Sequence, residues 1–77
     1  MLKISPDTNL VSLFRAAKAA RGEVWFQTTE GDRLNMKSLL SQYIILAAFD
    51  DENNTLWKNA EVVCENEEDV QLLTDSL

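Results

Sequence analysis

The spacing of the hydrophobic residues changes several times along this chain, and each change marks a step between a strand and a helix. Alternation at a period of two, which is typical of strands, occurs over residues 2–5, 23–29, 34–36 and 60–64. Spacings of three and four, which are typical of helices, occur over residues 9–21, 35–48 and 66–77. The patterns therefore predict the element order β-α-β-β-α-β-α.

Length and cysteine content decide what can stabilise such a fold. The 77 residues allow one domain, 1–77, which buries only about 60% of its unfolded surface. Cys64 is the single cysteine, so no internal disulfide is possible and the fold has to depend on packing. We therefore expect an α+β fold, an open-faced β-sandwich in which a four-stranded, mostly antiparallel sheet carries three helices on one face.

The predicted first helix has an apolar face and a basic stripe. Thr8 or Asn9 is expected to cap its start, and Gly22 stands where a helix-ending glycine belongs. Its apolar face consists of Leu10, Leu13, Phe14, Ala17 and Ala20. The basic residues expected on the opposite side are Arg15, Lys18 and Arg21. Such a stripe either binds an acidic partner or is a solvated helix face that suits the C-terminal end of the dipole.

A β-hairpin is predicted after this helix. One face of its first strand is formed by Val24, Phe26 and Thr28, and the other by Trp25 and Gln27. A turn at residues 30–32, with a glycine at its centre, leads into the returning strand.

The second half of the chain contains another helix, a loop, a strand and a last helix. The second helix is expected from about Asn35 to Ala48, with Met36, Leu39, Leu40, Tyr43, Ile44 and Ala47 repeating at helical spacing. The polar loop that follows, 49–57, is expected to be exposed and mobile over its acidic part. The last helix is expected to be capped by Asn66 and to have an apolar edge of Val70, Leu73 and Leu77.

The charge balance limits the classes of molecule that the protein is expected to bind. Thirteen acidic and seven basic side chains give a net charge of −6. Nucleic-acid binding is disfavoured, because phosphate contacts need clustered Lys and Arg. No apolar run approaches the ~20 residues of a membrane helix, and no basic apolar leader opens the chain. We therefore expect a cytoplasmic protein without a membrane segment, a monomer or weak homodimer, whose partners are other proteins.

Four segments, 11–18, 23–31, 34–40 and 62–73, resemble parts of one family. They are similar to the first helix, the central hairpin, the start of the second helix, and the last strand and helix of HPr, the histidine phosphocarrier of the bacterial sugar phosphotransferase system. The Lys-Ser-Leu-Leu stretch at 37–40 is the most specific piece. The predicted element order is also that of the family, so the resemblance implies an HPr-like sandwich.

Two departures separate the chain from that family. The family's segment between the first strand and first helix contains the histidine that takes the phosphoryl group and an arginine that helps to hold it. Here residues 5–9 read Ser-Pro-Asp-Thr-Asn, and the chain has no histidine. Imidazole passes a phosphoryl group on readily, whereas serine and threonine esters are too stable for such a relay. We therefore expect that this protein has no phosphocarrier activity and is not an enzyme. The second departure is the added loop at 49–57.

Ser38 is the sharpest candidate for regulation. In Gram-positive members of the family, the serine of this Lys-Ser pair is phosphorylated by a dedicated kinase and then binds a transcription regulator. A phosphate at a helix N-terminus is electrostatically favourable. The plainer interpretation is that Ser38 is simply a good first-turn residue.

Partner docking has its own candidates. In the family, apolar residues of the first two helices form the docking surface, which points to Leu39, Leu40 and Tyr43, with Arg15 and Lys18 as contacts for an acidic partner. Exposure of Leu40 or Tyr43 would support this role. The alternative is that most of this stripe belongs to the core.

Other chemistry finds little support. Asp50, Asp51 and Glu52 lack the alternating ligands and the sixth-position glycine of a calcium loop, so we expect no metal site and no cofactor. Cys64 has no histidine to activate it and is expected to be a packing residue. Trp25 and Trp57 either mark a partner surface or cover the rim of a thin core.

The function predicted from these features is that of a non-catalytic HPr-like protein of the sugar phosphotransferase system, which acts by protein–protein contact or regulation. Its partners would be phosphotransferase components or a transcription regulator. The alternative is a small protein-binding module of similar fold that is unrelated to that system.

Overall fold

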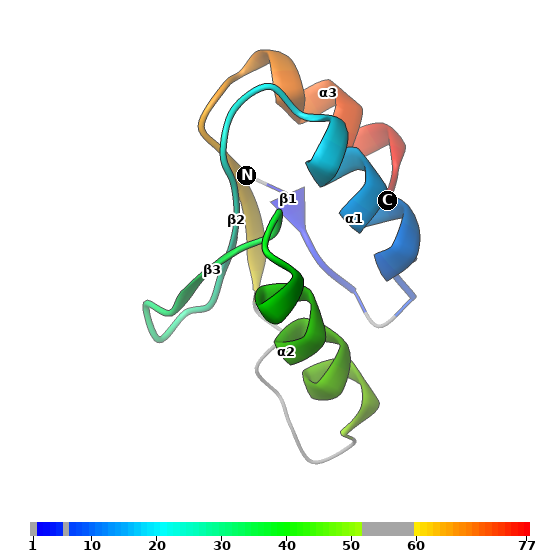
Figure 1. Cartoon of the computed structure of the whole chain (residues 1–77), viewed down its shortest axis with the longest axis vertical. Coiled ribbons are helices and arrows are strands. Elements are labelled where there is room, and N and C mark those ends of the chain that lie inside the picture. Colours follow the sequence, from blue (N-terminus) through cyan, green and yellow to red (C-terminus); the bar gives the residue numbers. More distant parts are fainter. Residues whose placement is uncertain (1, 6, 52–59) are drawn as a thin grey trace.

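The computed structural model describes residues 2–5, 7–51 and 60–77, and its elements follow the predicted order (Figure 1). The strands are β1 (Leu2–Lys3), β2 (Val24–Gln27), β3 (Arg33–Asn35) and β4 (Glu61–Cys64). The helices are α1 (Leu10–Ala19), α2 (Leu39–Asp50) and α3 (Glu68–Asp75). The α+β class predicted from the sequence is confirmed.

The four strands form one open sheet in the order β1-β4-β2-β3. Every pair of neighbours is antiparallel: Leu2 lies opposite Val62, Phe26 opposite Val62 on the other side, and Phe26 opposite Leu34. β1 and β2 therefore run parallel with β4 between them, and the helix α1 connects them. The strands β3 and β4, connected through α2, are related in the same way with β2 between them.

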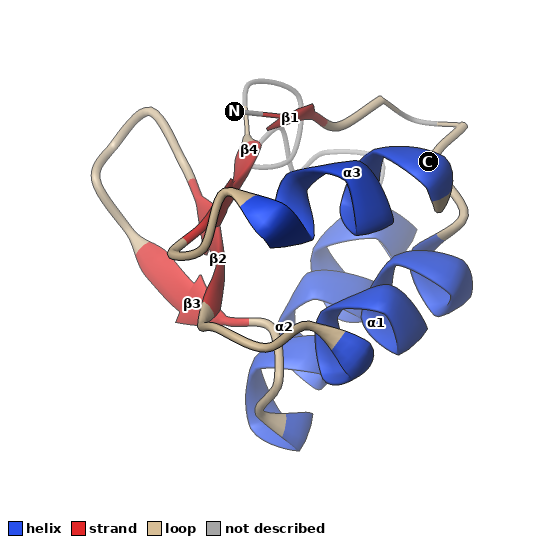
Figure 2. Cartoon of the chain, turned by 90° about the horizontal axis from the view of Figure 1, so that it is seen from above, coloured by secondary structure: helices blue, strands red, loops and turns tan. Residues whose placement is uncertain are grey.

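The helices lie together on one side of this sheet (Figure 2). The core between the two layers contains Val24, Phe26 and Val62 from the sheet, Leu13 from α1 and Leu73 from α3. On the other face, the guanidinium of Arg33 lies 4.7 Å from the centre of the Trp25 ring. The strand alternation predicted for the first strand of the hairpin is thereby confirmed, since Val24, Phe26 and Thr28 are buried and Trp25 is only half-buried.

The hairpin turn also follows the prediction. The Thr28 backbone amide donates to the Asp32 carbonyl at 3.0 Å, and the Gly31 amide donates to the Thr28 carbonyl at 3.1 Å. Gly31 has a φ of 93°, the positive value that glycine adopts without a steric penalty.

The helix α1 begins with a side-chain cap and ends without a glycine cap. At the start, the Ser12 amide donates to Oδ1 of Asn9 at 3.1 Å, so Asn9 rather than Thr8 is the cap. At the end, the helix stops in extended backbone at Ala20, and Gly22 does not take the positive φ expected of a helix-ending glycine. Gly22 instead allows close packing, because a Cβ there would lie 3.1 Å from Cβ of Asn66.

The predicted start of α2 near Asn35 is wrong. Asn35 pairs with Trp25 as the last residue of β3, and the Met36 amide extends the ladder by donating to the Val24 carbonyl at 2.8 Å. Oδ1 of Asn35 then accepts from the Lys37 amide, which holds the chain in a turn. The helix begins only at Leu39, with Ser38 as its cap, and it continues to Asp50 rather than stopping near Ala48.

Of the two interpretations of the apolar stripe of α2, the one that assigned most of it to the core is wrong. The buried residues of the helix are Ser41, Ile45 and Ala48. Of the predicted stripe only Met36 is buried, and it precedes the helix; Leu39, Leu40 and Tyr43 are 72%, 70% and 71% exposed. Most residues of this helix are apolar, so the sequence contained two overlapping stripes, and the inner one is formed by Ile45 with the short side chains of Ser41 and Ala48.

The structure also changes the expected start of the loop at 49–57 and the expected cap of the last helix. Phe49 and Asp50 belong to α2 instead of to the predicted loop, Asp50 and Asp51 are exposed, and the rest of that loop lies outside the described residues. In α3, Asn66 is not the cap: Glu67 occupies that position and its side chain makes no capping bond. The apolar edge of α3 is formed by the buried Leu73 and the half-buried Val70, whereas Leu77 is exposed.

Candidate protein-docking groove

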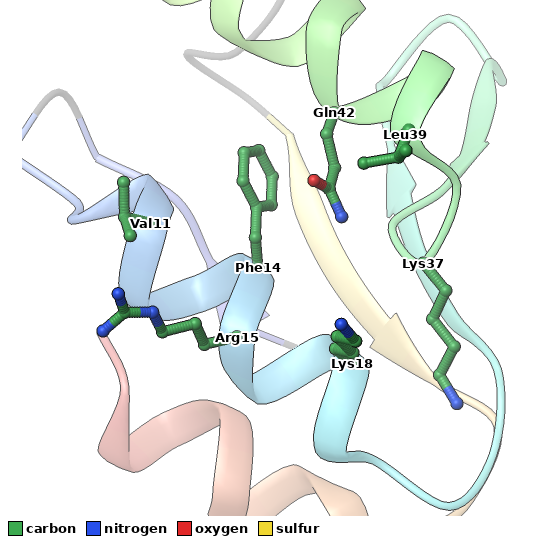
Figure 3. Close-up of a pocket in the computed structure, with 7 residues that line it drawn as sticks. All are labelled: Val11, Phe14, Arg15, Lys18, Lys37, Leu39 and Gln42. Atoms are coloured by element: carbon green, nitrogen blue, oxygen red, sulfur yellow. The ribbon is translucent and has the colours of Figure 1, made fainter.

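A groove of about 530 Å³ separates α1 from α2. Its lining comes from α1 (Val11, Phe14, Arg15 and Lys18), from α2 (Leu39 and Gln42) and from Lys37 just before α2 (Figure 3). Three apolar and three basic side chains and one amide thus line one opening, and none of the described lining residues is acidic. We call this feature the α1–α2 groove.

The α1 side of the groove is built by helical geometry. Val11, Arg15 and Lys18 are spaced by four and three residues, so they share one face of the helix. Each of the two basic residues follows an inward-facing residue by one position, a rotation of about 100°. The basic stripe therefore lies on the flank of α1 that faces α2, not opposite the core as predicted, and the third predicted member, Arg21, lies beyond the end of the helix.

Hydrogen bonds fix the other wall. Nζ of Lys37 donates to the Ala20 carbonyl at 2.8 Å, where a cation is favourable at the C-terminus of α1. Nε2 of Gln42 donates to the Met36 carbonyl at 3.0 Å. The first bond connects the segment before α2 to the end of α1, and the second holds the first turns of α2 against the residue that precedes the helix.

The electrostatics of the groove contrast with those of the whole chain. Three of the seven basic residues line it, although the net charge is −6. Among the described residues, neither Arg15 nor Lys18 forms an ion pair; the one ion pair there joins Lys3 to Glu61 at 3.3 Å on the sheet. The groove therefore offers positive charge beside apolar surface, a combination that suits an acidic segment with an apolar side.

Ser38 lies in the sequence between two lining residues of this groove, Lys37 and Leu39. It caps α2 in extended backbone, and its hydroxyl accepts from the Ser41 amide at 3.5 Å, the longest hydrogen bond described for the side chains. Its side chain is half-buried rather than part of the core. A modification at this position would stand at a helix N-terminus beside the apolar lining.

The predicted site residues are only partly brought together. Arg15, Lys18 and Leu39 meet in the groove, whereas Leu40 and Tyr43 do not line it and point to solvent from other sides of α2. The lining residues that were not named as site residues are Val11, Phe14, Lys37 and Gln42. The sequence contained a signal for Val11, because this apolar residue stands outside the inward stripe but in line with the two cations at helical spacing. In the structure it is 57% exposed.

The turn between β1 and α1 is closed by bonds between Ser5 and Thr8. The Ser5 amide donates to Oγ1 of Thr8 at 3.0 Å, and the Thr8 amide donates to the Ser5 carbonyl at 3.1 Å. The two hydroxyl oxygens are 3.4 Å apart. The backbone amides of both residues are thereby satisfied within the turn.

The thiol of Cys64, the single cysteine, is a poor nucleophile. Cys64 is half-buried against the core, and burial, together with the negative charge of Asp69, raises the pKa of its thiol. The protonated form is thereby favoured at neutral pH, and only the thiolate reacts readily.

Comparison of the chain with protein-family models, with curated proteins and with solved structures found no match. In the described part of the chain, none of the helices combines the length and apolar character needed to cross a bilayer. No three His, Cys, Asp or Glu side chains among the described residues are grouped so that they could hold a metal ion.

Proposed function

We propose that this protein is a non-catalytic protein-binding module that docks an acidic partner in the α1–α2 groove. The observation that carries the proposal is the segregation of charge, since Arg15, Lys18 and Lys37 stand around an apolar opening in a chain of net charge −6. Charge of one sign at a rim attracts and orients the opposite sign, and apolar surface at the centre holds what has been attracted.

The resemblance to HPr suggests the cellular system in which this docking would occur. The element order and the Lys-Ser-Leu-Leu stretch are those that the resemblance implies, and they support a role in the sugar phosphotransferase system in the cytoplasm of a bacterium. The partners would then be components of that system or a transcription regulator. The chain would act by contact and not by transfer, because it has no histidine to take the phosphoryl group.

Phosphorylation of Ser38 is the regulation that this proposal favours. A phosphate there would gain about 0.3–1 kcal/mol from the helix dipole and add nearly two negative charges beside Leu39. The groove would then lose part of its attraction for an acidic partner. Ser38→Asp should weaken docking while leaving the unfolding free energy nearly unchanged, and Ser38→Ala should dock like the parent protein. Equal binding by all three proteins, with no phosphoserine detectable in cells, would remove the regulatory role.

Docking is tested by calorimetric titration with the general phosphotransferase enzyme. We expect binding that Arg15→Glu and Lys18→Glu each weaken by about tenfold or more, because a like charge facing an acidic surface costs several kcal/mol. Arg33→Glu is the matched control, since it makes the same charge change on the other face of the sheet and should bind like the parent protein. Incubation with phosphoenolpyruvate and the same enzyme should yield no acid-labile phosphate on this chain.

The second candidate is a binding module outside the phosphotransferase system, and the sequence of residues 5–9 favours it. In the HPr family the kinase also docks around the histidine segment, whereas here Ser5 and Thr8 form a self-bonded turn in that place. Proteins recovered from cells with the parent chain, but not with the Arg15→Glu variant, distinguish the two. Phosphotransferase components among them support the first candidate, and their absence supports the second. Identical recovery by both chains would contradict docking in the groove.

A further inference from the structure

The outer side of α2 carries a second surface that the groove does not use. Leu40, Tyr43, Ile44 and Ala47 are all exposed and are spaced as i, i+3, i+4 and i+7. This is the spacing by which a helix buries one face against a neighbour. In the described structure the stripe faces solvent, and we call it the α2 outer face.

The charge on this face differs from that of the groove. From Leu39 to Phe49 the helix contains no charged residue, and the nearest charges are Lys37 before it and Asp50 as its last residue. A surface that meets its own copy across a two-fold axis has to be complementary to itself. The cationic groove fails that condition because like charges would meet, whereas an uncharged apolar stripe fulfils it.

The charge at the end of α2 favours one relative orientation of two α2 helices that pack together. Asp50 stands at the C-terminus of its helix, where the dipole disfavours a negative charge, and no basic residue occupies the last turn. In an antiparallel pair of α2 helices, each Asp50 comes close to the N-terminus of the other helix, where the dipole favours it. A membrane is the less suitable occupant, because the stripe has no flanking cluster of cations to meet anionic lipid.

We propose that the α2 outer face is the interface of a two-fold homodimer in which the two α2 helices pack antiparallel. The helix has 12 residues and is about 18 Å long. One helix face of this length buries less than the roughly 800 Å² per partner of a standard interface, so the dimer forms reversibly with rising concentration. The inference does not depend on the function of the groove, which lies on a different side of α2.

Sedimentation velocity over a concentration series tests the proposal through a charge swap. The parent protein should move from monomer to dimer as its concentration rises. Tyr43→Asp and Tyr43→Lys should each remain monomeric, because two like charges meet in an apolar contact, and an equimolar mixture of the two should dimerise again. Val11→Asp, an exposed apolar position in the groove, is the control and should dimerise like the parent.

Three outcomes would overturn the proposal. They are a parent protein that stays monomeric at every concentration, Tyr43 variants that still form homodimers, and a mixture that does not dimerise. Binding of the monomer to phosphatidylcholine or phosphatidylglycerol vesicles, lost in Tyr43→Asp, would assign the face to a membrane instead. Circular dichroism shows whether the variants stay folded, and loss of dimer without loss of groove binding separates this test from that of the proposed function.

Discussion

The helices α1 and α2 have similar lengths but opposite uses of their apolar residues. The helix α1 buries five of its ten residues, and α2 buries three of its twelve. In α1 the long side chains, such as Leu13 and Phe14, face inward; in α2 the long side chains Leu40 and Tyr43 face outward, while Ser41 and Ala48 face the core. The hydrophobic effect thus holds α1 in the fold, whereas in α2 most of the apolar surface stays exposed.

The tethers of the two helices differ in the same way. The loop after α1 is tied to α3, because the carboxylate of the buried Asp69 accepts from the Arg21 amide at 3.1 Å and from the Gly22 amide at 2.9 Å. The helix α2 is attached through the Lys37 bond before its first turn, through the buried Ile45 and Ala48, and through the half-buried Phe49. An apolar side chain therefore contributes much to the stability of the fold in α1 and little in α2. The comparison requires the same substitution at a buried position of α1 and at an exposed position of α2.

The largest expected effect separates the two helices directly. Leu13→Ala removes a side chain with no exposed surface and should lower the unfolding free energy by about 2–5 kcal/mol, through lost transfer energy and the cavity left behind. Leu40→Ala makes the same chemical change on the outer side of α2 and should alter the value by less than about 0.5 kcal/mol. Urea unfolding at a concentration low enough to keep the protein monomeric measures both. Similar losses in the two variants would erase the contrast.

A smaller and pH-dependent effect is expected at Asp69. The Gly22 and Arg21 amides, with support from the charges of Lys37 and Arg21, hold the pKa of this carboxyl below its ordinary value of 3.8 despite its burial. Because the folded-state pKa is the lower one, the carboxylate stabilises the fold above pH 3.8, and this contribution is lost as the pH falls through the lowered pKa. Asp69→Asn should therefore be less stable than the parent at neutral pH, with a gap that narrows in acid. A gap independent of pH would show that the charge is not responsible.

The smallest expected effect compares the two helix caps. Asn9→Ala removes the acceptor of a 3.1 Å bond at the start of α1 and should cost about 1 kcal/mol. Ser38→Ala removes an acceptor at 3.5 Å at the start of α2 and should cost less. Thermal unfolding of the two variants provides the measurement. A greater loss for Ser38→Ala would mean that the start of α2 is more firmly held than its geometry indicates.

The sequence predicted those elements in which a single period dominates. The alternation of the β2 strand and the stripe of α1 each have one solution, so the hairpin and the inward face of the first helix were predicted correctly. In α2 most residues are apolar, and periodicity could not decide which stripe faces inward. Short-range polar contacts were a further limit, because the Asn35 side chain bonds the Lys37 amide and delays the helix by four residues relative to the prediction.

Long-range contacts explain the rest. The approach of Gly22 to Asn66 and the bonds from Asp69 to the loop after α1 join residues more than 40 positions apart, and no local pattern encodes them. The same holds for the groove. The basic residues of α1 were identified, but the rotation that turns them toward α2, and the inclusion of Lys37 and Gln42, depend on how two distant elements pack.

The central claim is that the α1–α2 groove holds an acidic protein partner, and photo-crosslinking in cells tests it most directly. A photoreactive amino acid in place of Val11 should crosslink a defined protein, whose contact segment is acidic when mapped by mass spectrometry. The crosslink should disappear when Arg15→Glu and Lys18→Glu are added, although circular dichroism shows the chain still folded. The same amino acid in place of Thr29, exposed on the hairpin turn, should not capture that protein. Equal capture from both positions, or capture that survives the two charge reversals, would contradict the account.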